Sequence, residues 1–275
     1  MRSKIMKIDN KTKLYVSVSS NPGNTGSRLH NTCFKLLKVN AIYVPFKCNS
    51  IKEVLALIKS DKIFGISVSM PFKKKVYKYL NKVDKYSKLA KTVNTIVKKG
   101  KITIGYNTDI IAIKKILKKI NFRLIKTIVI LGNGAMAETI YNFLKKKYKN
   151  KIILCSRSLK KYSKWKIRKN DIKINWKKRN NISGNLLINS TPIGMRGIKD
   201  ETLLSKKQLV KFKFIIDLPV SKKNKLMTSA KKNRIQYFSG KEISFYQGVE
   251  QSKMYTNKIL NENLIKRKLN YSNDF

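Results

Sequence analysis

The segment GISVSMPFK carries two hydroxyl side chains and a lysine in a pattern that suits substrate binding and proton transfer. Ser67 and Ser69 lie at the end of a predicted strand over 63–70. Pro71 predicts the first turn of a helix, because the fixed φ of proline suits that position. Lys73 would then lie near a helix N-terminus, where the helix dipole disfavours a positive charge. Its placement therefore points to a role in chemistry, with a solvated lysine as the alternative.

Two polar segments further on, TVNT over 92–95 and GYNTD over 105–109, are predicted to form tight loops. Together they offer uncharged polar groups, Asn94 among them, and one carboxylate, Asp109. The chain has 14 Asp and Glu residues in all, so a carboxylate framed by glycine, tyrosine, asparagine and threonine is a candidate for chemistry. The alternative is that Thr108 or Asp109 caps the helix that follows.

A predicted strand over 127–131 runs into GNGAMA, which contains Gly132, Asn133, Gly134 and Ala135 and precedes a predicted helix. This fits the pattern G-x-G-x-x-A. The first glycine makes the tight turn, the second lets backbone N–H groups approach a pyrophosphate, and the small last residue lets helix and strand pack closely. The context favours a dinucleotide site over an ordinary strand-to-helix turn.

The next predicted strand, 152–156, ends at Arg157. NAD-binding proteins carry an acidic residue at this place to bind the ribose hydroxyl, whereas an arginine accommodates a 2′-phosphate. Arg157 therefore favours NADP over NAD. The alternative is one more basic residue in a basic protein, although arginine is rare in this chain.

Alternating apolar runs and amphipathic stretches predict the elements that position these residues. Ser50 and Glu53 form a capping-box signature before one of the helices. The alternation predicts an α/β fold with largely parallel sheets, the second sheet beginning at the glycine motif. Strands are expected at 14–19, 41–46, 63–70, 127–131, 152–156, 186–190 and 214–218, and helices at 30–38, 51–59, 109–120, 138–148 and from 242 onward.

Composition excludes several classes of protein. The chain has 275 residues, and its 42% hydrophobic content is too high for a disordered basic tail. No apolar run approaches the ~18–20 residues of a membrane span, and the N-terminus lacks a signal-peptide core. Cys33, Cys48 and Cys155 are odd in number and widely spaced, which predicts a cytoplasmic protein without disulfides. The single histidine, His30, excludes a site that needs two imidazoles, so we expect no metal; His30 itself is expected to pack at a helix start.

The formal charge of +49 raises the alternative of a nucleic-acid-binding protein. Two observations count against it. The charge is mostly lysine, whereas base reading and bidentate phosphate binding favour arginine. The lysines are also spread along the whole chain, whereas a dedicated site would concentrate them on one element. We therefore attribute the charge to compositional drift and expect no specific nucleic-acid partner.

Five motifs are shared with one family: SVSMPFK ending at Lys73, VNT at 93–95, GYNTD ending at Asp109, NSTPIGM ending at Met195, and Gly240 with Gln247. By these motifs the chain resembles the shikimate dehydrogenases through most of its length. The resemblance implies an N-terminal α/β substrate domain over 1–108, completed by C-terminal helices over 240–275, and a Rossmann NADP-binding domain over 109–239. It also implies reversible, NADP-dependent reduction of 3-dehydroshikimate to shikimate in chorismate and aromatic amino-acid biosynthesis.

By this resemblance, Lys73 and Asp109 form the catalytic pair. Hydride delivery to the ring ketone creates an alkoxide that needs a proton from a positioned acid. The lysine ammonium can donate it, and the carboxylate holds the ammonium and a ring hydroxyl. The residues implied to bind substrate are Ser67, Ser69, Asn94, Asp109 and Gln247. Those implied to bind the nucleotide are Gly132, Asn133, Gly134, Ala135 and Arg157, with Met195 and Gly240 near the nicotinamide.

The chain departs from the family pattern at three places. The Ser-x-Ser-Pro motif for the substrate carboxylate is replaced by NPGNTGSRLHN, in which Thr25, Ser27 or Arg28 could take that role. Ser67 stands where the family usually has asparagine. The late Asp-x-x-Tyr reads Asp217-Leu-Pro-Val, without the tyrosine.

Two segments, GSRLHN and VSMPFK, look most like the shikimate dehydrogenase-like branch of the family. The alternative function is therefore an enzyme of that branch acting on quinate or a related hydroxylated ring acid. In either case we expect a small-molecule substrate, no membrane partner, and a monomer or homodimer.

Overall fold

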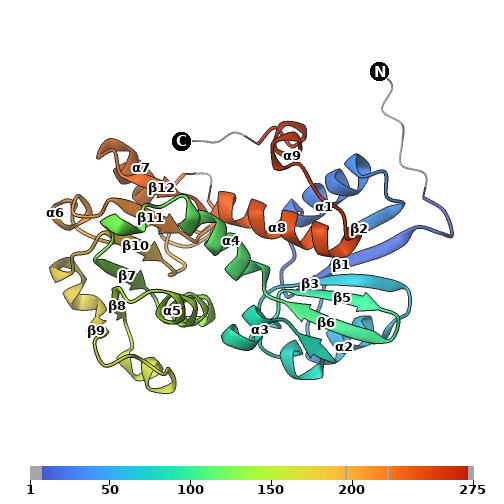
Figure 1. The fold of residues 1–275 in the computed structure, drawn as a ribbon, viewed down its shortest axis with the longest axis horizontal. Coiled ribbons are helices and arrows are strands. Elements are labelled where there is room, and N and C mark those ends of the chain that lie inside the picture. The colour runs from blue at the N-terminus through green and yellow to red at the C-terminus, as the bar shows by residue number, and fades with distance from the viewer. Residues whose placement is uncertain (1–7, 196, 222, 272–275) are drawn as a thin grey trace. The chain divides into compact units, whose positions relative to one another are not determined.

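The computed structural model describes residues 8–195, 197–221 and 223–271, and the chain divides into two compact units. Residues up to Ile111 and from Phe245 onward form the first unit, and Ala112–Ser244 form the second. The chain passes from one to the other within helix α4 (Thr108–Lys118) and returns within helix α8 (Gly240–Thr256). Figure 1 labels the elements in chain order.

The first unit contains a mixed six-stranded sheet with the order β2-β1-β3-β5-β6-β4. Strands β1, β2 and β3 are parallel, β5 runs antiparallel to β3 and β6, and β4 is parallel to β6. The strands are β1 (Lys13–Ser19), β2 (Ala41–Lys47), β3 (Ile63–Val68), β4 (Lys82–Val83), β5 (Thr95–Lys99) and β6 (Ile102–Tyr106). Its other α-helices are α1 (Thr25–Leu36), α2 (Ile51–Lys59), α3 (Lys85–Ala90) and α9 (Glu262–Lys268).

The sheets are largely parallel, as expected, but strand β5 pairs antiparallel with β3 and β6. The β5–β6 hairpin corrects the expectation of a tight loop over 105–109. Only Gly100 and Lys101 connect the two strands, and a connection this short can join only antiparallel neighbours. Gly100 has φ +59°, a left-handed conformation that glycine adopts without steric cost. Gly105 and Tyr106 close strand β6, so the candidate residues that follow begin directly at a strand end.

Alternation along the strands builds an apolar cluster on each face of this sheet. Tyr15 of β1 and Tyr43 of β2 pack with Tyr255 of α8 in one cluster. Val16 and Val18 of β1, which point to the opposite face, pack in the other cluster, which also contains Val54 and Ile58 of α2. Helix α2 begins where the sequence predicts, with the Ser50 hydroxyl accepting a hydrogen bond of 3.3 Å from the Glu53 N–H.

The second unit is a six-stranded parallel sheet with the order β12-β11-β10-β7-β8-β9. Counted from β7, this is the 3-2-1-4-5-6 order of the dinucleotide-binding fold. The predicted two-domain α/β class is therefore confirmed. The strands are β7 (Thr127–Leu131), β8 (Lys151–Ser156), β9 (Ile172–Asn175), β10 (Leu186–Asn189), β11 (Phe214–Asp217) and β12 (Gln236–Phe238), and the α-helices α5 (Ala135–Lys147), α6 (Lys206–Leu209) and α7 (Lys225–Lys232).

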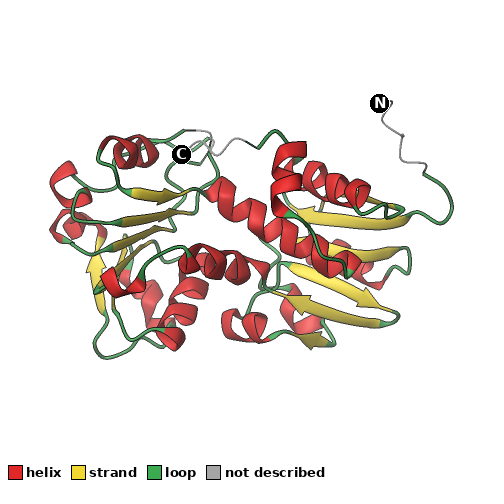
Figure 2. Cartoon of the chain, turned by 45° about the horizontal axis from the view of Figure 1, so that its top comes forward, coloured by secondary structure: helices red, strands yellow, loops and turns green. Residues whose placement is uncertain are grey.

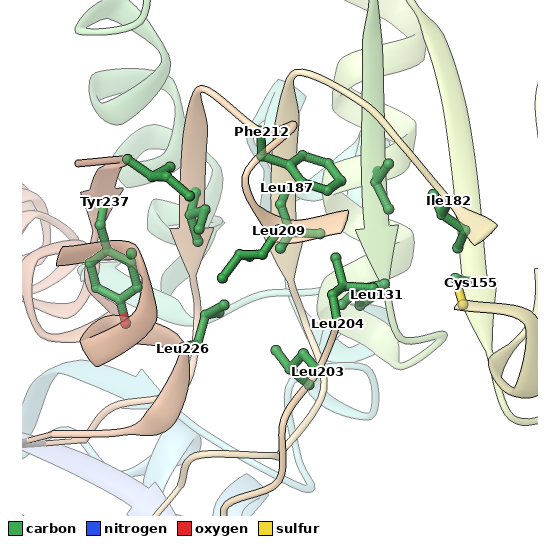
Figure 3. Packing of buried hydrophobic residues seen from close by; sticks show 14 of the residues in the cluster. Leu131, Cys155, Ile182, Leu187, Leu203, Leu204, Leu209, Phe212, Leu226 and Tyr237 are labelled. Atoms are coloured by element: carbon green, nitrogen blue, oxygen red, sulfur yellow. The ribbon is translucent and has the colours of Figure 1, made fainter. Parts of the chain in front are cut away.

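Parallel strands that are buried on both faces consist of continuous apolar runs, and this pattern predicts β7, β10 and β11 from the sequence. Helices lie on either side of this sheet (Figure 2). Figure 3 shows one of its packed faces, where Leu187 of β10 meets Leu209, Phe212 and Leu226 from the surrounding helices and loops. This packing fixes the strand ends that carry the glycine motif and Arg157.

The structure corrects the helix predicted to begin at Pro71. Residues 71–75 form turns, and a short 3₁₀-helix, η1, covers Val76–Tyr79. The Lys73 carbonyl accepts a hydrogen bond of 3.0 Å from the Val93 N–H, so it is committed to a neighbouring segment rather than to the next helical turn. The helix-dipole argument for Lys73 is therefore wrong, and the reason for its placement lies elsewhere.

His30 packs inside the first unit, in the second turn of α1. The residue is 1% exposed, its Nδ1 lies 2.7 Å from the Ser252 hydroxyl, and its ring stacks on Tyr43. Burial lowers the pKa of His30 to about 3, because a charged imidazole would be desolvated there. The imidazole is consequently neutral in the folded protein at physiological pH.

Acidification should therefore destabilise the fold through His30. Below pH ~6.5 the unfolded chain protonates this imidazole while the folded protein does not, so the contribution is full above that pH and is lost as pH falls toward 3. At pH 5 the loss amounts to about 2 kcal/mol. Urea unfolding of the wild type and of His30→Phe at pH 7 and pH 5 measures this, because the variant should lack that part of the decrease. Equal decreases in both proteins would contradict it.

Among the residues that the structure describes, no helix is both long and apolar enough to cross a membrane.

Candidate active site

Lys73 and Asp109 form a close ion pair in the first unit. The Lys73 Nζ lies 2.6 Å from the Asp109 Oδ2, and the two side chains are 30% and 12% exposed. Asp109 belongs to the first turn of α4, and Lys73 to the turns that follow β3. The ammonium is thus held at one end by a buried carboxylate and still reaches solvent. A lysine placed in this way can donate a proton to a bound ligand.

Backbone hydrogen bonds join the three segments that the sequence singled out. The Val93 N–H donates to the Lys73 carbonyl at 3.0 Å, and the Asn94 N–H donates to the Tyr106 carbonyl at 3.1 Å. The Asn94 carbonyl in turn accepts from the Val68 N–H at 2.8 Å. The segments at the ends of strands β3, β5 and β6 are therefore bonded to one another, and they carry Lys73, Asn94 and Asp109.

Asn107, rather than Thr108 or Asp109, caps helix α4. Its Oδ1 accepts from the Ile110 N–H at 3.1 Å, and its Nδ2 donates to the Thr92 hydroxyl at 2.9 Å. The capping alternative for Asp109 is therefore wrong. Asn107 takes the capping role, and the Asp109 carboxylate contacts Lys73 instead.

The Asn94 side chain has a fixed orientation and one unmet donor. Its Oδ1 accepts from the Thr108 N–H at 2.9 Å, from the Thr108 hydroxyl at 3.1 Å and from the Thr95 hydroxyl at 3.0 Å. A backbone N–H can only donate, which settles that the amide oxygen faces Thr108. Asn94 is 1% exposed, and its Nδ2 has no hydrogen-bond partner within the described ranges. A buried donor in this state is a binding position for a ligand acceptor.

The other predicted substrate residues differ in their surroundings. Ser67 is not free, because its hydroxyl lies 2.8 Å from the Tyr255 hydroxyl and 3.2 Å from the Gln251 Oε1. Ser69 is exposed, and its backbone is fixed by a hydrogen bond to the Val18 carbonyl. Gln247 is half-buried on α8.

Sequence reasoning missed Gln251, which is 3% exposed and contacts the Asn94 carbonyl through its Nε2 at 2.9 Å. It lies four residues after Gln247, and residues at this spacing share a helix face. That spacing was the available signal, since two amides on one face of a predicted helix can serve the same site.

In the second unit, the glycine motif lies where strands β7 and β10 adjoin. Gly132 has φ +108°, and a Cβ there would approach the Ser190 carbonyl oxygen to 2.8 Å, so the position requires glycine. Ser190 follows β10, which places the loop over 190–195 beside the glycine motif. The strand order of the sheet reverses between β7 and β10, and dinucleotides bind at such a reversal point.

The start of helix α5 is open to a phosphate. Gly134 is the N-cap and is exposed, and a Cβ there would meet no atom within 4 Å. Ala135 begins the helix and is also exposed, whereas Ala137 is fully buried against the sheet. The first turn of a helix presents unpaired N–H groups and a positive dipole end, which suit a pyrophosphate.

Asn133 connects the glycine motif to the segment that carries Arg157. Its Nδ2 donates to the Ser158 carbonyl at 2.8 Å and to the Ser156 hydroxyl at 3.1 Å. Arg157 itself is exposed directly after β8, and its carbonyl accepts from the Asn175 Nδ2 at 3.4 Å. An exposed guanidinium beside the glycine motif is available to a 2′-phosphate.

Met195 and Gly240 occupy different settings. Met195 is 38% exposed in the segment between β10 and α6. Gly240 begins α8, where a Cβ would collide with the Pro219 carbonyl oxygen, so close packing of α8 on the segment after β11 requires glycine there. The structure thus supplies a packing reason for Gly240 that does not involve a cofactor.

Asp217, the remnant of the family's Asp-x-x-Tyr, is fully buried. It accepts hydrogen bonds of 2.7 Å from the Nδ2 of Asn189 and of Asn224, and a further one from the Tyr237 hydroxyl. Burial raises the pKa of the Asp217 carboxyl. Asn189 also accepts from the Thr191 N–H, so this network holds the 190–195 loop in place.

Of the candidates for the substrate carboxylate, Arg28 donates through Nη2 to the Leu269 carbonyl at 3.1 Å, and Ser27 donates to the Asn24 carbonyl.

Within the described ranges, no group of three or more His, Cys, Asp or Glu side chains is arranged to hold a metal ion.

The chain is similar to proteins of known family. A family model described as the shikimate dehydrogenase substrate binding domain matches residues 24–96. A shikimate dehydrogenase (NADP(+)) from Saccharolobus solfataricus is 33% identical over 90% of both chains. A shikimate dehydrogenase-like protein from Haemophilus influenzae is 29% identical over 94% of this chain and 96% of its own length.

A solved structure of a shikimate dehydrogenase in complex with NADP+ superimposes with a TM-score of 0.83 at 27% identity, covering 96% of each chain. The similarity therefore extends over both units, and each comparison points to the same family.

Proposed function

We propose, from the premise that the chain belongs to the shikimate dehydrogenase family, that it catalyses the reversible, NADP-dependent reduction of 3-dehydroshikimate to shikimate. The observation that carries the proposal is the 2.6 Å pair of Lys73 and Asp109, together with the unmet donor of Asn94, whose side chain is bonded to the residue before Asp109. An amine acid, a carboxylate and an amide donor suit a ring that bears a ketone and several hydroxyl groups. The pathway role proposed is chorismate and aromatic amino-acid biosynthesis.

In this mechanism, the chain's own residues move one proton and hold the ring. During reduction, the Lys73 ammonium donates its proton to the oxygen that becomes the new hydroxyl. In the oxidation direction, the neutral amine removes that proton. Asp109 keeps the amine in place and accepts a hydrogen bond from a ring hydroxyl, while the Asn94 Nδ2 donates to another. Ser69 and Gln247 are proposed as further contacts to the substrate.

We propose that the second unit, Ala112–Ser244, is the NADP domain, which the sequence-based division places at 109–239. The fit rests on the glycine-only turn at Gly132, the open N-terminus of α5 at Gly134, and the exposed Arg157. When bound, the nucleotide supplies or accepts the hydride. Gly132, Asn133, Gly134 and Ala135 would hold its pyrophosphate, and Arg157 its 2′-phosphate, with Met195 near the nicotinamide.

Arg157→Ala should raise KM for NADP+ about tenfold or more, because a hydrogen bond to a charged group contributes about 1.5–3 kcal/mol. KM for NAD+, which lacks the 2′-phosphate, should stay unchanged. Arg123→Ala is the matched control, since Arg123 is an exposed arginine before β7, at the opposite end of the strands. Steady-state kinetics with both nucleotides measure the effect; an equal loss for NADP+ and NAD+ would contradict the assignment.

A second candidate is an enzyme of the shikimate dehydrogenase-like branch acting on quinate or a related ring acid. It is favoured by the similarity to the Haemophilus influenzae protein and by the replacement of the Ser-x-Ser-Pro motif. The proposal is tested by comparing kcat/KM for shikimate and quinate with each nucleotide. Shikimate with NADP+ should be the best pair, and a preference for quinate would establish the second candidate instead.

We also propose a cytoplasmic location. The three cysteines are free and buried in the structure, which suits a reducing compartment.

A further inference from the structure

Gln251 is buried in the first unit, and the proposed mechanism does not use it. Its amide makes three hydrogen bonds from α8 to the sheet. Nε2 donates to the Asn94 carbonyl and to the Thr95 hydroxyl, both at 2.9 Å, and Oε1 accepts from the Ser67 hydroxyl at 3.2 Å. Two of the three partners are therefore Asn94 itself and the residue next to it.

The hydrogen bonds around Gln251 have a defined direction. Because the Thr95 oxygen accepts from Gln251, its own hydrogen is free to donate to the Asn94 Oδ1, 3.0 Å away. At the other end, the Ser67 hydroxyl donates to Gln251, so the Tyr255 hydroxyl is the donor in the 2.8 Å contact with Ser67. The chain of donors thus runs from Tyr255 to the Asn94 oxygen.

Together with the Thr108 N–H, this chain of hydrogen bonds determines which group Asn94 can offer to a ligand. Its Oδ1 is occupied by donors from Thr95 and Thr108, so its NH2 is the side-chain group that finds no partner among the described residues. Rotation of the amide by half a turn would place two NH2 hydrogens against the Thr108 N–H, which also donates. Such an arrangement leaves buried donors unpaired and is costly.

We propose that Gln251 is a positioning residue, which fixes Asn94 with its amide NH2 presented to a hydroxyl of the bound ring acid. The inference rests on the proposed function, because that function supplies the ligand. Gln251 acts through Asn94 and Thr95 and does not itself need to touch the substrate. The alternative is that its amide only attaches α8 to the sheet.

Gln251→Met removes all three hydrogen bonds while keeping a side chain of similar length. We expect KM for shikimate to rise about tenfold, the loss of one well-placed hydrogen bond, with kcat and KM for NADP+ changed less than about threefold. Gln236→Met, at an exposed glutamine of β12, is the matched control and should change neither constant. Gln251→Glu, which keeps an acceptor for Ser67 and lacks both donors, should give the same shift if the Met variant folds poorly.

A double-mutant cycle separates positioning from attachment. If Gln251 acts through Asn94, then adding Gln251→Met to Asn94→Ala should raise KM for shikimate by less than about twofold further. A full additional tenfold increase in the double variant would overturn the inference. So would an equal fall in kcat with both nucleotides in the single variant, which indicates general disruption.

A ligand-free measurement keeps this inference distinct from the proposed function. In protein labelled with ¹⁵N at asparagine, the Asn94 side-chain NH2 signals are identified by their absence in Asn94→Ala. In Gln251→Met they should shift toward the position of a free amide, while in Gln236→Met they should not move. Unchanged signals in Gln251→Met would overturn the positioning role. Failure of the wild type to oxidise shikimate would instead count against the proposed function and would leave the NMR result readable.

Discussion

Lys73→Ala should lower kcat for shikimate oxidation by about 10²- to 10⁴-fold, the usual contribution of a positioned general acid or base. The Lys73 Nζ is the nitrogen that the carboxylate of Asp109 holds at 2.6 Å. Without it, the proton of the reacting hydroxyl must leave to water. Binding of NADP+ should persist, because the glycine motif and Arg157 belong to the other unit.

Two comparisons make this experiment specific. Lys73→Met keeps most of the apolar stem and removes the charge, so it should be as slow as the alanine variant. Lys74→Ala changes an exposed lysine one residue along and should retain kcat within about twofold. Retention of wild-type kcat by both Lys73 variants would show that another group transfers the proton.

Asp109→Asn should lower kcat by about 10²-fold or more, because it preserves shape but removes the charge that orients the ammonium. An amide can accept one hydrogen bond from Lys73, but it cannot match the attraction of a carboxylate that is only 12% exposed. Asp61→Asn, at an exposed aspartate of the turn before β3, is the control and should be neutral.

The double variant tests whether the two residues act as a unit. If Asp109 works by holding Lys73, then Lys73→Ala with Asp109→Asn should be about as slow as Lys73→Ala alone. Multiplication of the two single losses in kcat would mean that Asp109 acts in proton transfer by some route other than holding Lys73, whereas loss of its proposed hydrogen bond to the ring hydroxyl should be seen in KM.

The second unit was readable in sequence because its strands are local and buried on both faces. Thr127–Leu131 and Leu186–Asn189 are short apolar runs followed by glycine or polar turns, a pattern with few alternatives. The sequence predicts a tight turn that needs glycine at Gly132, and the structure shows that no larger residue fits there. The family resemblance stated from the motifs is likewise confirmed.

The mixed sheet of the first unit was missed for a physical reason. The segment over 92–109 was interpreted from its polar residues, which occupy the strand ends, while its hairpin strands contribute Ile96 to one face and Val97 to the other. The helix predicted at Pro71 failed because the Val93 N–H takes the Lys73 carbonyl. Such competition between segments is invisible in local pattern.

The contacts of Gln251 lay furthest beyond sequence reasoning. Its partner Ser67 is 184 residues away, and nothing in the spacing indicates that the two meet. The pairing of Lys73 with Asp109 likewise came from the family resemblance and not from their spacing. Composition alone pointed elsewhere, since +49 suggests nucleic acid, whereas the proposed catalytic group uses one of 63 basic residues.

The most direct test of the proposed function is the reduction of NADP+ by the purified protein in the presence of shikimate, followed by the near-ultraviolet absorbance of NADPH. We predict shikimate-dependent formation of NADPH, with 3-dehydroshikimate as the product, that falls about 10²-fold or more in Lys73→Ala. A wild-type protein that binds NADP+ but reduces it with neither shikimate nor quinate would contradict the proposed function.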